Sequence, residues 1–140
     1  MSQENVELVR RAYEVFNLRE LSWSASEFFS RASEFFAPDI EIDLSRNVFN
    51  AATFRGYEGV ERAVVMVNDV WDDFRFEVEE LIDAGDKVFA AVQLSGKGKG
   101  SGVPVDQHDI HVCTVRDGKV VRIDVHRNRA EALKAAGLSE

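Results

Sequence analysis

The sequence predicts a single α+β domain, and three observations support this prediction. Helix-type spacing of apolar residues fills most of the first half of the chain, strand-type alternation fills most of the second half, and a short helical segment follows. Helices and antiparallel strands that are segregated along a chain are typical of the α+β class. The length of 140 residues is that of one domain with one core. We therefore expect residues 1–140 to form one domain, with helices packed on one face of an antiparallel sheet.

Two helices are expected before the first strand. Apolar residues at three- and four-residue spacing predict an amphipathic helix that ends near Asn17. A second helical stretch, from Leu21 to Ala37, contains a tandem repeat of seven residues (25–31 and 32–38) with a Phe pair in each copy. Seven residues are nearly two helical turns, so both pairs would lie on almost the same helix face, which favours a core role over a ligand-binding one. Pro38 is expected to end this helix.

The remaining elements are predicted from alternation and turn residues. Ile40, Ile42 and Leu44 alternate with acidic residues, as in a strand with one buried face. The elements expected after this strand are an irregular segment at 45–55, a helix from about Val60 to Trp71 opened by glycines 56 and 59, four antiparallel strands between 74 and 127, and a last helix from Arg129 to Ala136.

The strand from Lys87 to Ser95 is apolar on both faces. Its even-numbered positions are apolar, and Phe89 and Ala91 keep the other face apolar as well. A strand that is apolar on both faces is covered on both faces. Because the helices are expected on one face only, a second copy of the chain is expected to cover the other face in a two-fold homodimer.

Composition excludes several classes of function. The net charge of -8 argues against nucleic-acid binding, which relies on a basic surface. No apolar run approaches the roughly 20 residues of a membrane-spanning helix, and no export signal is readable, so we expect a cytoplasmic protein without a membrane partner. Cys113 is the single cysteine, which excludes an intrachain disulfide and any multi-cysteine metal site.

No metal or cofactor is expected. In the strand register preferred below, His108, His111 and His126 do not share a face, and no predicted helix carries a paired-histidine motif. The glycine-rich segment 96–102 lacks the spacing and the strand-to-helix context of a phosphate-binding loop. A hairpin or strand end is the better interpretation of that segment.

Several segments together resemble SnoaL-like proteins, related to polyketide cyclases, of the nuclear-transport-factor-2-like superfamily. They are Gln3–Asn17, Arg55–Val60, Glu79–Asp86, Arg116–Val121, Arg129–Leu133 and Ala136–Leu138. The resemblance implies a cone-shaped, curved antiparallel sheet with helices packed on its concave face, as in cystatin-like folds, and an internal pocket for a small hydrophobic molecule. Relatives on this scaffold include isomerases, cyclases, dehydratases, epoxide hydrolases and proteins that only bind, so the resemblance is specific for the fold and not for the function.

The resemblance also implies which residues line the pocket. They are expected to be Phe16, Leu44, Trp71, Cys113, Ile123, Val125 and Arg127.

The face on which Asp109 and His111 lie depends on the turn at residues 116–118, because a shift by one residue exchanges the two faces of a strand. A two-residue turn at Asp117 and Gly118 would place His111 opposite Asp124, on a polar surface. A three-residue loop with left-handed Gly118 would place His111 opposite Ile123, and both polar residues in an apolar wall. The second register is preferred because related enzymes carry polar working residues on this strand, facing the cavity.

The resemblance implies only partial sets of catalytic residues. In ketosteroid isomerase a Tyr and a protonated Asp form the oxyanion hole and another Asp is the base, and the corresponding positions here are Ala12, His111 and Leu44. In SnoaL-type cyclases the positions of a Gln-like residue, a His and an Asp base correspond to Asp109, His111 and Val125. Known isomerase chemistry is therefore not expected, and Asp109 would have to replace the missing base.

Two functional hypotheses follow. In the first, the chain is a cofactor-free enzyme acting on a carbonyl-bearing hydrophobic metabolite, with His111 as acid or electrophilic donor and Asp109 as base. In the second, the same residues orient a bound molecule without converting it. The alternative to a reactive pair is a buried His111 bonded to a backbone carbonyl and an Asp109 paired with Arg127 at the pocket mouth. A module that serves only for dimerisation is a third possibility.

Overall fold

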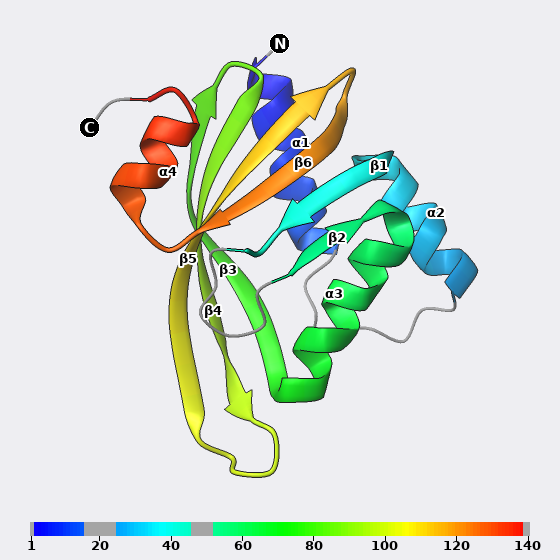
Figure 1. The fold of residues 1–140 in the computed structure, drawn as a ribbon, viewed down its shortest axis with the longest axis vertical. Helices are drawn as coiled ribbons and strands as arrows, with labels where there is room; N and C mark the ends of the chain where they lie inside the picture. Colours follow the sequence, from blue (N-terminus) through cyan, green and yellow to red (C-terminus); the bar gives the residue numbers. More distant parts are fainter. Residues whose placement is uncertain (1, 16–24, 46–51, 139–140) are drawn as a thin grey trace.

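The computed structural model describes residues 2–15, 25–45 and 52–138. Figure 1 shows a strongly curved sheet with α1, α2 and α3 on one side and α4 on the other. The elements, in chain order, are α1 (Ser2–Val15), α2 (Ala25–Phe35), β1 (Phe36–Asp43), β2 (Thr53–Arg55), α3 (Gly56–Val70), β3 (Trp71–Ala84), β4 (Lys87–Gly98), β5 (Pro104–Arg116), β6 (Lys119–His126) and α4 (Arg129–Ala135).

The sheet has the strand order β2-β1-β6-β5-β4-β3. Neighbouring strands are antiparallel except β1 and β6, which run parallel, so the sheet is mixed. The predicted α+β class with helices against a curved sheet is confirmed. β1 pairs with β2, the next strand in the chain, at one edge, and with β6, the last strand in the chain, at the other edge, where the parallel pair forms.

The two copies of the Phe-Phe repeat are not equivalent in the structure. The helix ends at Phe35, three residues before Pro38, and Phe36 begins β1 opposite Val120. The prediction of one helix to Ala37 is therefore wrong, because strand pairing outweighs the local helical pattern. Pro38 lies within an irregularity of the β1–β6 register, where its missing N–H is tolerated. The core role of the aromatic residues is confirmed for Phe28, Phe35 and Phe36, which are all buried.

The segment after β1 also differs from the prediction. Thr53–Arg55 form β2, paired with β1, within the stretch expected to be irregular. Helix α3 then begins directly at Gly56, and Trp71 already belongs to β3. A Cβ atom on Gly59 would lie 2.9 Å from the backbone carbon of Phe54, so this first turn of the helix packs too closely on β2 for any other residue.

Two apolar clusters lie on opposite faces of the sheet. The larger one fills the concave face beneath α1, α2 and α3. The smaller one lies under α4, where Phe89, Ile110 and Val112 contact residues from 132 to 136. Phe89 is fully buried, and the Arg129 guanidinium lies 5.0 Å from the centre of its ring. The expectation that a second chain must cover Phe89 is thus corrected, since α4 of the same chain covers it.

The glycine-rich segment forms the hairpin that joins β4 and β5. Gly98 accepts a hydrogen bond from the Gly102 N–H at 2.9 Å and donates its own N–H to Val103 O at 2.9 Å. In the described residues, no helix is long and apolar enough to cross a membrane.

Candidate functional site

The β5–β6 turn has a geometry that neither sequence-based alternative anticipated in full. Asp117 and Gly118 both have positive φ (53° and 76°), and Arg116 pairs with Lys119, so the turn has two residues. The preferred three-residue loop is therefore wrong. Between Thr114 and Val115 the register shifts, because β6 contains one extra residue at that point.

This β-bulge determines which side chains enter the concave face. Beyond it, Cys113 lies opposite Ile123 and His111 lies opposite Val125. The turn is one residue shorter than the preferred loop, and the bulge adds one residue to β6. Each change alone would exchange the two faces of β5, so together they leave its side chains on the faces that the three-residue loop predicted. Asp109 and His111 consequently share the side of the sheet on which the helices α1 and α3 lie.

A cavity of about 480 Å³ lies between this face and the helices α1 and α3. Its walls are mainly apolar. Of the residues expected to line a pocket, the cavity wall contains Leu44, Trp71, Cys113, Ile123, Val125 and Arg127, together with Asp109 and His111. Phe16 lies outside the described residues. The polar part of the wall comes from Tyr13, Gln107, Asp109, His111 and Arg127.

His111 is held between two aromatic rings. Its Nδ1 atom shares a short hydrogen bond with the Tyr13 hydroxyl, and the two rings stack with centroids 5.8 Å apart. Phe76 contacts the imidazole edge-on at 5.9 Å. Burial lowers the pKa of His111 to about 4, because the charged ring would lose its hydration. His111 is therefore neutral near pH 7.

Tyr13 is a site residue that sequence reasoning missed. The resemblance had placed the relevant tyrosine position at Ala12, which also lines the cavity. Burial raises the pKa of Tyr13 well above its usual value. Burial likewise raises the pKa of Cys113 to about 12. The only signal for Tyr13 in the sequence is its place on the apolar side of the first helix.

Asp109 has partners of its own. Both of its carboxylate oxygens accept hydrogen bonds from Gln107 Nε2 at 3.1 Å, and Arg127 Nε lies 3.1 Å from Oδ1. Burial raises the pKa of Asp109, while the Gln107 bond and the Arg127 charge oppose this rise. The side chain of Asp109 is only 4% exposed, whereas that of Arg127 is 46% exposed. The pair therefore extends from the cavity wall toward solvent. Gln107 could have been found from the alternation, since it lies two residues before Asp109 on the same face.

Asp109 and His111 line one cavity without bonding to each other. The hydrogen bonds of His111 lead to Tyr13, and those of Asp109 lead to Gln107 and Arg127. The alternative interpretation of an Asp109 paired with Arg127 thus matches the geometry, whereas the expected partner of His111, a backbone carbonyl, is replaced by a phenol. The site offers a neutral donor and, separately, a buried carboxylate.

The other two histidines lie away from the cavity. His108 is exposed, and its Nδ1 lies 2.8 Å from Glu79 Oε1. His126 lies opposite Ile110, on the outer face of the sheet. Among the described residues, no group of three His, Cys, Asp or Glu side chains could hold a metal ion.

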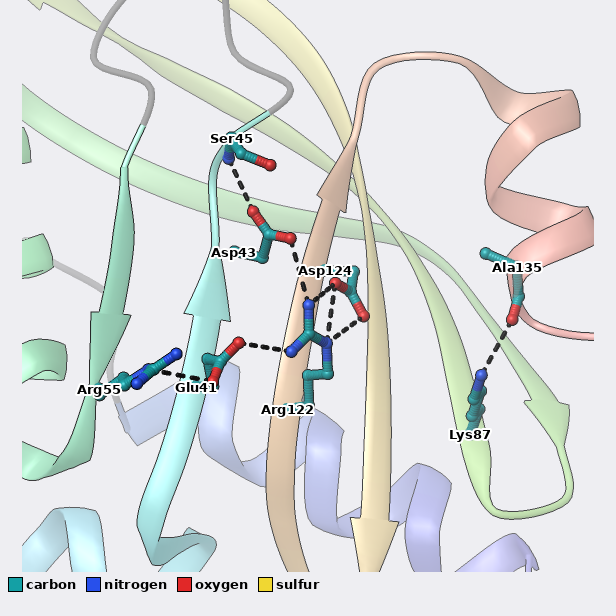
Figure 2. A network of polar contacts seen from close by, with 8 residues as sticks. All are labelled: Glu41, Asp43, Ser45, Arg55, Lys87, Arg122, Asp124 and Ala135. Atoms are coloured by element: carbon teal, nitrogen blue, oxygen red, sulfur yellow. Dashed lines mark hydrogen bonds and ion pairs between the residues drawn. The ribbon is translucent and has the colours of Figure 1, made fainter.

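A second charged cluster lies on the opposite face of the sheet, and Figure 2 shows it from close by. Arg122 alternates with the cavity-lining Ile123 and therefore projects outward. Its guanidinium binds Glu41 Oε1 at 2.6 Å, Asp43 Oδ2 at 3.2 Å and Asp124 Oδ1 at 2.9 Å, and Arg55 adds a bond to Glu41 at 3.1 Å. We call these five residues the outer network. It joins β2, β1 and β6.

Comparisons with known proteins agree with this architecture. A family model described as the SnoaL-like domain matches residues 9–123. No curated protein matches the sequence at a significant level.

Solved structures with the same fold are numerous. A putative SnoaL-like polyketide cyclase from Jannaschia sp. CCS1 superposes with a TM-score of 0.74 at 20% identity, covering 99% of this chain and 95% of that one. TerC, co-crystallised with polyporic acid, has a TM-score of 0.71 at 20% identity, covering 96% and 98%. A protein with a ketosteroid-isomerase-like fold from Catenulispora acidiphila, in complex with trimethylamine, has a TM-score of 0.69 at 16% identity, covering 94% and 93%.

Proposed function

The chain belongs to the SnoaL-like domain family, and from this premise we propose that it binds a small, mainly apolar metabolite in its cavity and catalyses proton transfer next to a carbonyl group of that molecule. One observation carries the proposal. Three polar side chains, Gln107, Asp109 and His111, alternate along β5 into a cavity whose other walls are mainly apolar. Such a wall binds the body of an apolar molecule and leaves few places for its polar group.

His111 is the proposed donor to the carbonyl oxygen. It is neutral because burial lowers its pKa to about 4, and it is 8% exposed. A neutral N–H in a dry site can stabilise the negative charge that develops on a carbonyl oxygen when a proton leaves the neighbouring carbon. Because the donor is already fixed by Tyr13 and Phe76, little reorganisation is needed at that moment.

Asp109 is the proposed base. Burial raises its pKa, which makes the carboxylate a stronger base than an aspartate in water. Arg127 keeps it ionised and stays 3.1 Å away at the solvent side. Gln107 donates to both oxygens of the carboxylate, so a substrate must replace or share that bond before the proton can be taken.

Structures of the fold support a small-molecule ligand. One of them was obtained with polyporic acid and another with trimethylamine. Sequence identities of 20% and 16% do not carry either ligand over to this chain. We extend to it only the expectation that the cavity takes a small organic molecule.

The enzyme hypothesis is tested with 2-tetralone, a compact apolar ketone, in D₂O. The purified protein should accelerate exchange of the hydrogens next to the carbonyl, followed by mass spectrometry. Asp109→Asn should lower the rate above background by about a hundredfold or more, the usual contribution of a general base. Asp124→Asn, in the outer network, should leave exchange unchanged. Equal rates with and without wild-type protein, despite measured binding, would argue against turnover of this ketone class.

Binding without turnover is the second candidate function. It is favoured by the pairing of Asp109 with both Arg127 and Gln107, which leaves the carboxylate engaged and apart from His111. Calorimetric titration with 2-tetralone separates the two candidates, since saturable heat without exchange indicates a binding protein.

A matched pair of α3 variants tests whether the cavity is the binding site. Ala63 lines the cavity, whereas Val65, two residues later, is 52% exposed. Ala63→Leu should reduce the affinity for 2-tetralone by filling space in the cavity, and Val65→Leu should leave it unchanged. Equal affinity in both variants would place the ligand elsewhere.

The homodimer stays a prediction, although the reason for it has changed. Phe89 is covered by α4, so a two-fold contact would have to use other parts of the outer face. Light scattering at micromolar concentration measures the oligomeric state directly.

A further inference from the structure

We infer that Tyr13 is a positioning residue: its hydroxyl donates to Nδ1 of His111 and thereby fixes the imidazole in the tautomer that carries its proton on Nε2. The use of that N–H toward a carbonyl group rests on the proposed function. The tautomer itself is a property of the ligand-free protein.

Geometry leaves one ring nitrogen for a ligand. The Tyr13 hydroxyl occupies Nδ1, and the His111 ring forms part of the cavity wall. Nε2 makes no hydrogen bond to the residues that the structure describes. If Nδ1 is the acceptor, Nε2 must hold the single proton of the neutral ring and act as a donor. The opposite tautomer would offer the cavity an acceptor, which cannot stabilise charge on a carbonyl oxygen.

The direction of the bond follows from the acidity of the two groups. A phenol O–H is a better donor than a neutral imidazole N–H, and the unprotonated imidazole nitrogen is a better acceptor than a phenol oxygen. Both groups are neutral near pH 7, because burial raises the pKa of Tyr13 and lowers that of His111. The proton therefore lies on the Tyr13 oxygen and is shared toward Nδ1.

Packing keeps the ring from turning over. Tyr13 comes from α1 and stacks on the imidazole, whereas Phe76 comes from β3 and contacts both rings edge-on. A flip of His111 would exchange Nδ1 and a carbon atom and break the bond to Tyr13. Tyr13 on α1 thus fixes the orientation of His111 on β5, which lies 98 residues later in the sequence.

The test is a long-range ¹H–¹⁵N spectrum of uniformly ¹⁵N-labelled, ligand-free protein near pH 7. The His111 signals, assigned by their loss in His111→Gln, should show an unprotonated Nδ1 and a protonated Nε2. In Tyr13→Phe the pattern should move toward a mixture of tautomers, and the pKa of His111 should rise, because a donor that stabilised the neutral ring is gone. Tyr57→Phe is the matched control, since it removes another half-buried hydroxyl, bonded to Phe36 O at 2.9 Å, and should leave the His111 signals unchanged.

A proton on Nδ1 in the wild-type protein would overturn the inference, even if Tyr13→Phe did not fold. Unchanged His111 signals in a folded Tyr13→Phe would also overturn it. Neither result depends on binding or exchange of 2-tetralone, so failure of this inference and failure of the proposed function are separate outcomes. The expected tautomer together with an inactive protein would leave the positioning role intact and remove only the reaction.

Discussion

Two arginine–carboxylate clusters lie on opposite faces of the sheet, and they differ in what they do to their members. In the outer network, Arg122 meets three carboxylates, from Glu41, Asp43 and Asp124. Its side chain is 39% exposed, and the hydrogen bond to Asp124 is the main cause that raises its pKa. Here the neighbouring carboxylates favour the charged form of Arg122.

The cavity cluster has the opposite character. Asp109 is buried with one half-exposed cation, Arg127, and its pKa is raised rather than lowered. His111, on the same face, has its pKa lowered. Both groups are moved toward their neutral forms by burial, which is the environment that acid–base sites provide. The outer network holds strands together, whereas the cavity cluster keeps groups in states that a surface position would not allow.

The largest effect expected from this difference is a loss of stability in acid that is due to His111. The unfolded ring takes up a proton below its ordinary pKa of about 6.5, whereas the folded ring stays neutral down to about 4. Its contribution is therefore complete above pH 6.5 and is lost as the pH falls toward 4, amounting to about 3 kcal/mol over that window. The measurement is the free energy of unfolding in urea at pH 7 and at pH 4.5, for wild type and His111→Gln.

The difference between the two proteins isolates His111, because Asp109 titrates in both and has the opposite sign. Its raised pKa makes protonation in the folded state easier, so its own contribution improves as the pH falls. His108→Gln is the control. Glu79 raises the pKa of the exposed His108, so this residue adds stability in acid rather than removing it. Equal acid sensitivity of wild type and His111→Gln would contradict the burial of a neutral ring.

A smaller effect is expected from Arg122→Ala, which would leave three carboxylates of the outer network close together without their shared cation. The loss of stability at pH 7 should be about 2 kcal/mol, between the values for exposed and for buried ion pairs. Arg75→Ala, on an exposed position of β3, should change stability by less than about 0.5 kcal/mol. Urea unfolding midpoints measure both. If the two variants lose the same amount, the outer network has no structural role.

The smallest change in stability is expected from Arg127→Ala. Asp109 can take up a proton when its cation is removed, so the cost should stay below about 1 kcal/mol, while the pKa of Asp109 should rise further. A ¹³C titration of the Asp109 carboxyl follows this change. A large loss of stability, or a lowered pKa, would show that the two clusters do not differ as described.

Local sequence pattern was sufficient for the fold class and for placing Asp109 and His111 on one face of the same strand. The alternation along β5 puts Asp109 and His111 on one face regardless of register, because successive side chains of a strand point to opposite sides. The same rule places Ile123 and Val125 together on β6, and the structure has all four in one cavity wall.

The choice between the two faces of β5 could not be made from local pattern. It depends on the two-residue turn at Asp117–Gly118 and on the bulge that follows it. Each shifts the preferred register by one residue, and the total shift of two restores the face while His111 pairs with Val125 instead of Ile123. A bulge leaves little trace in hydrophobic alternation, because it changes pairing and not residue type. The preferred three-residue loop therefore predicted the inward direction that Asp109 and His111 have, although the structure does not contain that loop.

Long-range packing decided the rest. Helix α4 covers Phe89. The apolar pattern of β4 indicates only that Phe89 is covered, because an intrachain helix and a second chain would satisfy that pattern equally. The meeting of Tyr13 with His111 joins residues 98 positions apart and depends on how α1 docks on the sheet. Periodicity shows that a side chain is buried, because burial follows from the pattern of one element. Which group it meets there is determined by the docking of two elements, and that exists only in the folded chain.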